Sequence, residues 1–134
     1  MSSEFTIGDL ARRVGVNIET IRYYERVGIM PRPKRSMSGR RRYDESDFST
    51  LTFIRKAREL GFAVEDTRAL LTLRNADDAC PDVKPIAVRR LNEVRADLRR
   101  AMEVERLLSD ALARCPGGGP ENSCPVLKVL ENAG

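Results

Sequence analysis

The sequence of 134 residues contains no histidine, no tryptophan, only three cysteines and no long apolar run. Without histidine, the chain lacks the most frequent general base of enzymes and the base of Ser-His and Cys-His catalytic arrangements. An odd number of cysteines argues against a disulfide framework and leaves core thiols, redox thiols or metal ligands. No apolar stretch approaches the roughly 20 residues of a membrane-spanning helix. These absences point away from an enzyme and a membrane protein, and towards a cytoplasmic protein.

Basic residues are abundant and unevenly distributed. The chain has 20 arginines against 4 lysines and a net charge of +4. Residues 1–60 carry 13 basic and 8 acidic side chains, whereas residues 61–134 carry 11 and 12. Within the first half, residues 32–42 hold six basic side chains and no acidic one. Such a run can be a solvated loop, or it can bind a nucleic acid.

Two short amphipathic helices are predicted before this basic run. Apolar residues at helical spacing follow Thr6, a suitable N-cap, and Gly15 can end the first helix in the left-handed conformation. Asn17 can cap a second helix, which Gly28 and Pro31 end. Two short helices joined by a tight glycine turn are typical of a helix-turn-helix, whose second helix enters the major groove of DNA. The same pattern also fits any αα-hairpin.

The second helix carries residue types that suit DNA recognition. Arg22 and Arg26 are four residues apart and share one face. A guanidinium can donate two hydrogen bonds to guanine or bind a phosphate. The hydroxyl of Tyr24 can also bind a phosphate, although Tyr23 or Tyr24 can equally be a packing aromatic. Only together with the basic run that follows do these residues favour a helix-turn-helix over a plain αα-hairpin.

The basic run itself is interrupted by Pro33 and Gly39, which favours a short two-stranded wing over a helix between Arg32 and Tyr43. A helix-turn-helix followed by a basic wing predicts a winged DNA-binding unit. A second helix pair follows this unit. Its first helix ends at Gly61, its second is shorter, and its apolar residues are expected in the core.

The C-terminal half contains one long predicted helix. Between Pro85 and Arg114 the chain has no internal glycine or proline. Apolar residues recur there at alternating spacings of three and four, and comprise Ala87, Leu91, Val94, Leu98, Ala101, Leu108 and Leu112. Glu105 interrupts this seam. A helix of about 30 residues with one narrow apolar stripe cannot bury the stripe alone, so the pattern predicts a coiled-coil dimer.

The three cysteines lie around this helix, with Cys80 before it, Cys115 at its end and Cys124 beyond a loop. At about 1.5 Å per residue, a largely helical segment separates Cys80 from Cys115 by roughly 50 Å, so the two thiols cannot meet within one chain. In an antiparallel dimer, Cys80 of one protomer lies beside Cys115 and Cys124 of the other. Each cysteine alone is more often an inert core thiol. Their convergence favours two three-thiolate metal sites per dimer, and a thiol redox sensor on the same fold is the alternative.

The donor set orders the candidate metals. Three sulfur ligands and no imidazole favour soft cations, with Hg(II) first and Pb(II) close behind. Structural zinc usually takes four ligands. Zn(II) or Cd(II) would therefore need water or a carboxylate such as Asp77, Asp78 or Asp82.

Several motifs resemble those of the MerR family of bacterial transcription regulators, in the same order and spacing. They comprise Thr6–Ala11, Glu19–Glu25, Gly28-Ile29, Arg41–Tyr43 and Leu60–Phe62. One departure is Arg40, where many relatives carry a wing tyrosine. Pattern and resemblance together predict a mainly α protein with three parts. Residues 1–75 form a winged helix-turn-helix DNA-binding domain with a second helix pair, residues 76–114 form a linker and a dimerisation helix in an antiparallel coiled coil, and residues 115–134 form a metal-binding loop and a short C-terminal helix.

The resemblance also implies functional residues. The DNA contacts of the family map onto Arg22, Tyr24, Arg35, Arg41 and Arg58. The spacing of the three cysteines is similar to that of mercury-responsive members, in which the first cysteine comes from one subunit and the other two come from its partner. Lead-responsive members have closely similar spacing.

By the same resemblance, a homodimer binds a palindromic operator between two promoter elements that are too far apart for good contact with RNA polymerase. The metal-free protein represses, and the metal-bound protein bends and untwists the DNA so that both elements align. Such a deformation costs on the order of several kcal/mol, which protein–DNA contacts supply. The resemblance therefore implies a metal-responsive regulator of a heavy-metal resistance operon, without enzymatic activity.

Overall fold

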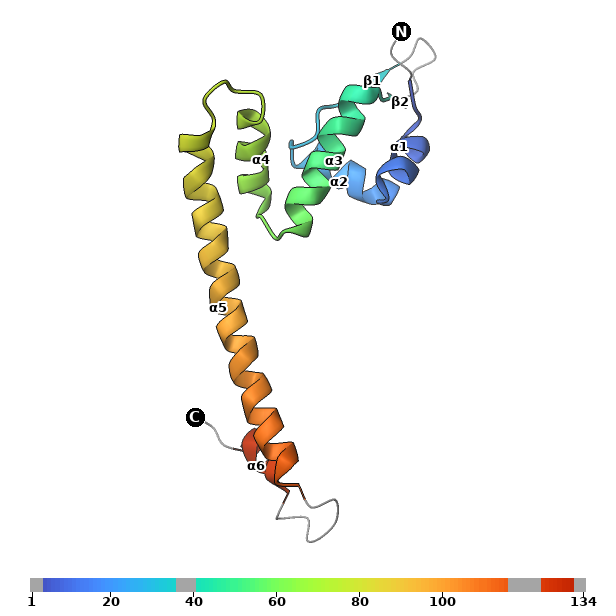
Figure 1. The fold of residues 1–134 in the computed structure, drawn as a ribbon. Coiled ribbons are helices and arrows are strands. Elements are labelled where there is room, and N and C mark those ends of the chain that lie inside the picture. Colours follow the sequence, from blue (N-terminus) through green and yellow to red (C-terminus); the bar gives the residue numbers. More distant parts are fainter. Residues whose placement is uncertain (1–3, 36–40, 116–123, 132–134) are drawn as a thin grey trace. The chain divides into compact units, whose positions relative to one another are not determined.

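The computed structural model describes residues 4–35, 41–115 and 124–131, with the backbone alone at 34, 35 and 41. The chain forms two compact units, Met1–Ala87 and Val88–Gly134. The described part is mainly helical, as predicted (Figure 1). In chain order its elements are α1 (Ile7–Val14), α2 (Ile18–Arg26), β1 (Lys34–Arg35), β2 (Arg41–Arg42), α3 (Glu45–Glu59), α4 (Val64–Leu73), α5 (Cys80–Ala113) and α6 (Pro125–Glu131).

The first two helices begin and end at the residues that the sequence predicts. The Thr6 hydroxyl accepts a hydrogen bond from the backbone N–H of Asp9 at 3.1 Å, and the Asp9 carboxylate accepts one from the N–H of Thr6 at 3.3 Å. This capping box satisfies two N–H groups that α1 leaves without helical partners. Gly15 ends α1 with a φ of 87°, and the Asn17 side chain accepts from the N–H of Thr20 at 2.8 Å. The predicted helix-turn-helix arrangement is confirmed.

The predicted wing is an antiparallel hairpin of β1 and β2. Its register pairs Lys34 with Arg42 and Arg35 with Arg41. Just beyond β2, the N–H of Tyr43 donates to the carbonyl of Phe5 at 3.0 Å, and the N–H of Phe5 donates back at 2.6 Å. The segment before α1 and the end of the hairpin are therefore joined by backbone hydrogen bonds.

A single apolar core holds this N-terminal part together, and helix α1 packs against both α2 and α3. The buried residues of the core are Leu10, Ala11, Val14, Ile21, Tyr24, Ile29, Met30, Tyr43, Leu51 and Ile54. Val64 and Leu71 of α4 pack against the edge of this cluster. Gly61, with a φ of 87°, makes the turn between α3 and α4. The second helix pair is thus confirmed.

An arginine links the start of the chain to α3. The guanidinium of Arg13 lies 4.5 Å from the ring centroid of Phe5 and 4.2 Å from that of Phe48. Its Nη1 also lies 3.0 Å from a carboxylate oxygen of Glu45. A cation between two aromatic faces is attracted by both rings. Arg13 therefore adds a polar connection beside the apolar core.

The long helix begins earlier than the sequence indicates. Because a proline suits the first turn of a helix, the sequence predicts that the helix starts at Pro85. Helix α5 instead begins at Cys80, with Pro85 inside it. Pro85 lies only five residues from the start, so the helix loses one backbone hydrogen bond near an end where N–H groups already lack helical partners. The N–H groups of Asp82 and Val83 both donate to the carbonyl of Ala79, which closes the first turn.

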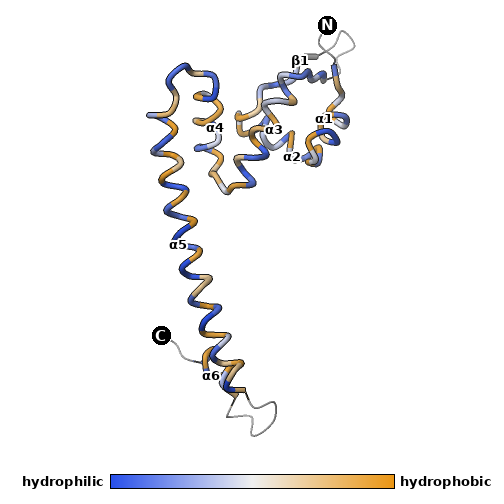
Figure 2. The backbone as a smooth tube through the Cα atoms, viewed as in Figure 1, coloured by the Kyte–Doolittle hydropathy of each residue, from blue (hydrophilic) through white to orange (hydrophobic). Residues whose placement is uncertain are grey.

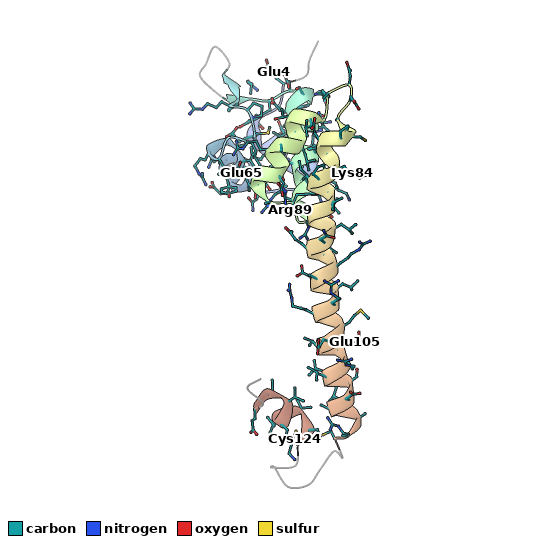
Figure 3. All side chains as sticks on the ribbon, turned by 90° about the vertical axis from the view of Figure 1, so that its left-hand side faces the viewer. Glu4, Glu65, Lys84, Arg89, Glu105 and Cys124 are labelled. Carbon is teal, nitrogen blue, oxygen red and sulfur yellow. The ribbon has the colours of Figure 1, made fainter. Side chains whose placement is uncertain are left out.

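The apolar stripe of α5 is exposed within the single chain. Hydrophobic and hydrophilic residues alternate along the helix (Figure 2). Leu91 is 45% exposed, Leu98 58% and Leu112 63%, whereas Ala111, near the end of the helix, is fully buried. Helix α6 lies near that end of α5 in both views (Figures 1 and 3). Among the described residues, no helix combines the length and apolar character needed to cross a membrane.

Candidate nucleic-acid interface and metal-ligand residues

Helix α2 presents a charged and aromatic face. Arg22 donates to the carboxylate of Glu19 at 2.8 Å, and its side chain remains 48% exposed. One turn further on, the guanidinium of Arg26 lies 6.0 Å from the ring centroid of Tyr23, which is itself 42% exposed. An exposed i, i+3 ion pair contributes little to stability. Arg22 can therefore exchange Glu19 for a phosphate or a base edge at small cost.

Tyr24 lies inside the core rather than on this face. It is 8% exposed, and its carbonyl accepts hydrogen bonds from the N–H groups of Ile29 and Met30, both at 3.1 Å. Its ring centroid lies 5.7 Å from that of the exposed Tyr23. Of the two tyrosines, the structure makes Tyr24 the packing aromatic. A phosphate contact by its hydroxyl remains a prediction.

The two wing arginines occupy paired backbone positions on the two strands of the wing. Arg35 on β1 and Arg41 on β2 are direct cross-strand partners. Their side chains lie outside the described residues, so their contacts with DNA remain predictions. On the same strand, the Arg42 Nε lies 3.9 Å from a carboxylate oxygen of Glu4.

Arg58 lies at the last turn of α3. It is exposed, and its guanidinium donates to the carbonyl oxygen of Phe62, just beyond the glycine turn. Basic side chains near a helix C-terminus stabilise the carbonyl groups that lack helical partners. Arg58 therefore has a structural partner within the chain, and its phosphate contact remains a prediction.

Arg68, in α4, and Arg74, the C-cap of α4, have structural roles that the sequence did not reveal. Arg68 donates to the carbonyl oxygens of Val27 at 2.6 Å and Gly28 at 3.1 Å. Arg74 donates to the Ser49 hydroxyl at 2.8 Å, and its guanidinium lies 5.2 Å from the ring centroid of Phe53. Arg68 lies about forty positions from its carbonyl partners. A local sequence pattern carries no signal for such contacts.

The three cysteines lie at element ends. Cys80 is the first residue of α5 and is exposed. Cys115, also exposed, follows the end of α5, and its N–H donates to the carbonyl of Leu112 at 3.1 Å. Cys124 is half-buried and precedes α6 directly, as Figure 3 shows. No disulfide joins them, and the described part of one chain brings no three cysteine or acidic residues together as a metal site.

Comparisons with known proteins identify the family of this chain. Residues 5–73 match the family described as MerR HTH family regulatory protein, and residues 48–111 match the family described as MerR, DNA binding. A mercuric resistance operon regulatory protein of Bacillus cereus is 36% identical over 128 residues, which cover 95% of this chain and 97% of that relative.

Two solved structures extend the similarity to the whole fold. The transcription regulator PbrR691 from Ralstonia metallidurans CH34, in complex with lead(II), has a TM-score of 0.76 and 30% identity, covering 94% of this chain and 98% of its own. The dual function transcriptional regulator MerR from Bacillus megaterium MB1, in complex with a mercury(II) ion, has a TM-score of 0.64 and 31% identity, covering 96% and 100%. This chain belongs to the MerR family of helix-turn-helix transcription regulators.

Proposed function

We propose that this protein is a metal-responsive transcription regulator of a heavy-metal resistance operon, with Hg(II) as its inducer. It acts as a homodimer on promoter DNA. The single observation that carries the proposal is the placement of the cysteines. Cys80 opens α5, whereas Cys115 and Cys124 follow its other end.

The dimer follows from the exposed stripe of α5. Its leucines stay between 42% and 63% exposed in one chain. A second copy of the same helix, packed against this stripe, removes the apolar surface from water. In this proposal residues 1–75 bind DNA, residues 76–114 connect and dimerise, and residues 115–134 hold two of the three metal ligands.

The metal site follows from the direction of the two helices. When they run antiparallel, Cys80 of one protomer comes to the end of α5 at which Cys115 and Cys124 of the other protomer lie. Each dimer then has two sites of three thiolates, and no cysteine is left over. Thiolate is the protein ligand that soft cations prefer. The donor set therefore fits Hg(II), which the similar Bacillus megaterium structure contains.

Pb(II) is the second candidate inducer. The structure with the TM-score of 0.76 is a complex with lead(II), and three thiolates also suit that ion. Cd(II) and Zn(II) rank lower because they favour a fourth ligand, and the chain contains no histidine to supply it.

The DNA-binding half supplies the other part of the proposal. Arg22 reaches the major groove from α2, Arg35 and Arg41 reach phosphates from the wing, and Arg58 binds a phosphate beyond it. Tyr24 supplies a phenolic hydroxyl near the same backbone. Metal binding changes transcription only if it favours the activating dimer over the repressing one. The activating dimer distorts the promoter so that RNA polymerase contacts both of its elements.

Titration of the reduced protein with metals tests the proposal. Hg(II), Pb(II), Cd(II) and Zn(II) are added in the presence of a competing small thiol, while ultraviolet thiolate–metal bands and stoichiometry are recorded. We expect two Hg(II) per dimer, bound more tightly than the other ions. If Pb(II) binds more tightly than Hg(II), then Pb(II) and not Hg(II) is the inducer. The absence of a thiolate–metal band with every ion would exclude metal sensing.

Single substitutions of the ligands separate sensing from DNA binding. In Cys80→Ala, Cys115→Ala and Cys124→Ala, we expect induction to be lost and operator binding to be retained, because the ligands lie outside the winged unit. Response of a single-cysteine variant to oxidants instead of metals would support a thiol redox sensor.

A further inference from the structure

One charged residue occupies the apolar seam of α5. Glu105 comes four residues after Ala101 and three before Leu108, so it falls at the seam position of the repeating pattern. Its neighbours along this face are exposed apolar side chains, with Leu98 58% and Leu108 42% exposed. Glu105 is itself exposed in the single chain and lies in the C-terminal part of α5 (Figure 3).

A carboxylate at this position opposes dimerisation unless its surroundings compensate for the charge. A polar residue at a single seam position weakens a coiled coil, but it can specify which arrangement of the helices forms. The cost depends on what the second helix places against the carboxylate, because a buried charge needs a partner. Parallel and antiparallel dimers differ sharply in this respect.

In a parallel dimer each seam residue faces its own copy. The two Glu105 carboxylates would then meet inside the apolar seam, where like charges repel strongly. In an antiparallel dimer with Cys80 level with Cys115 of the partner subunit, Glu105 lies level with residue 90 of the partner. The two Glu105 residues are then about 20 Å apart along the helices, at about 1.5 Å per residue.

The antiparallel arrangement also gives Glu105 a basic environment. Arg90 immediately precedes the seam residue Leu91, and Arg95 immediately follows the seam residue Val94. The Arg90 side chain is 25% exposed and lies along the helix, with its Nη1 3.1 Å from a carboxylate oxygen of Glu93. Both arginines flank the part of the seam that Glu105 of the other subunit reaches.

We propose that Glu105 sets the antiparallel orientation of the dimer helices, by repulsion in the parallel dimer and by attraction to Arg90 of the partner subunit in the antiparallel one. This inference rests on the proposed dimer and names the residue that selects its orientation. The orientation matters for sensing because only antiparallel helices bring all three cysteines together.

Glu103 provides a matched control for this residue. It lies two residues before Glu105, on the opposite side of the helix, and its carboxylate lies 3.5 Å from Arg106 in an exposed pair. Glu103→Leu and Glu105→Leu remove the same charge from the same helix. Only the second change places an apolar side chain in the seam. Glu105→Gln removes the charge while keeping the size and polarity of the side chain.

The orientation is measured in full-length protein with Cys115→Ser and Cys124→Ser, so that Cys80 is the only thiol. Glutathione redox buffer links two Cys80 residues by a disulfide only where the first turns of α5 lie together, as in a parallel dimer. We expect little disulfide-linked dimer when Glu105 is unchanged, either in the parent protein or in Glu103→Leu. We expect severalfold more with Glu105→Leu, and an intermediate amount with Glu105→Gln.

Two further measurements complete the test. Sedimentation should show that Glu105→Leu dimerises about tenfold more tightly, because a charge has left the seam. With all three cysteines present, the same variant should bind fewer than two Hg(II) per dimer. Equal disulfide yields and full Hg(II) binding in Glu105→Leu and Glu103→Leu would overturn the role of Glu105. Abundant Cys80 disulfide with Glu105 intact would instead overturn the antiparallel dimer of the proposed function.

Discussion

The guanidinium of Arg68, on α4, donates a hydrogen bond of 2.6 Å to the carbonyl oxygen of Val27, the C-cap of α2. A second bond of 3.1 Å reaches the carbonyl of Gly28. The last carbonyls of a helix have no helical partners and carry partial negative charge, so a cation there is favourable. Arg68 thus joins the helix that carries Arg22 to the helix that precedes the long α5.

Replacing Arg68 by alanine should lower the free energy of unfolding by about 1.5 kcal/mol, because two charge-assisted hydrogen bonds are lost. Operator affinity should fall as well, since α2 loses a contact that fixes its end. Urea unfolding and fluorescence anisotropy measure the two effects. Arg12→Ala, which removes an exposed pair with Asp9, serves as the stability control and should change unfolding little. Equal stability of the two variants would contradict the role of Arg68.

Glycine replacements should separate backbone strain from contact with Arg68. Gly15 and Gly28 have φ values of 87° and 80°. Alanine at either position should destabilise by roughly 1 kcal/mol, because a side chain is disfavoured at positive φ. A Cβ at Gly28 would also lie 3.1 Å from the Arg68 Nη1, whereas at Gly15 the nearest atom is 3.9 Å away. Thermal unfolding should therefore show a larger loss for Gly28→Ala, and the difference between the two variants should vanish when Arg68→Ala is added.

Replacing Arg22 by alanine should weaken operator binding by about 1 to 3 kcal/mol and relax sequence preference, if its guanidinium reads a base. The fold should be unaffected, because Arg22 has only an exposed partner, Glu19, in the free protein. Anisotropy titrations on operator and scrambled DNA, over a range of salt, measure both quantities. A uniform loss on both DNAs with a smaller salt slope would identify a phosphate contact instead. Unchanged operator affinity would remove Arg22 from the interface.

Mixed dimers should reveal that the metal site is shared between subunits. One subunit carries Cys80→Ser, and the other carries Cys115→Ser with Cys124→Ser. Their mixed dimer should regain one complete three-thiolate site, although neither parent dimer has one. Competition for Hg(II) with a small thiol measures the recovery. Failure of the mixed dimer to bind more tightly than both parents would contradict a shared site.

The capping box of α1 should give the protein a small acid dependence. Hydrogen bonds from the Thr6 side chain and backbone hold the pKa of Asp9 below its ordinary value of 3.8, and the nearby Arg12 lowers the pKa further. A carboxyl whose pKa is lower in the folded than in the unfolded state stabilises the folded state at pH values above its ordinary pKa. This stabilisation is lost as the pH falls through the lowered pKa. Asp9→Asn should therefore be less stable than the parent at neutral pH, with the difference closing in acid. A pKa of 3.8 or higher for the Asp9 carboxyl, measured by NMR titration, would contradict this role of the capping box.

The helix ends of the DNA-binding half could be predicted from the sequence because they depend on local chemistry. Thr6 and Asn17 cap helices, and Gly15 and Gly61 adopt positive φ, because these effects need only neighbouring backbone. The same logic failed at Pro85, because a proline five residues into a helix removes one backbone hydrogen bond but does not stop the helix from extending back to Cys80. The Ala79 carbonyl accepts from the N–H groups of Asp82 and Val83 in the first turn of α5, and Pro81, the second residue of the helix, lies where a missing N–H costs no helical hydrogen bond.

The spacing of residues along the chain determined the winged helix-turn-helix, the exposed seam of α5 and the positions of the three cysteines at element ends. Only the tertiary structure decided that Tyr24 packs in the core while Tyr23 stays exposed. It alone also decided that Arg68 holds the end of α2. The physical reason is the distance along the chain over which each effect acts. Caps and periodicity act over a few residues, whereas burial and long-range hydrogen bonds depend on segments that meet only when the chain folds.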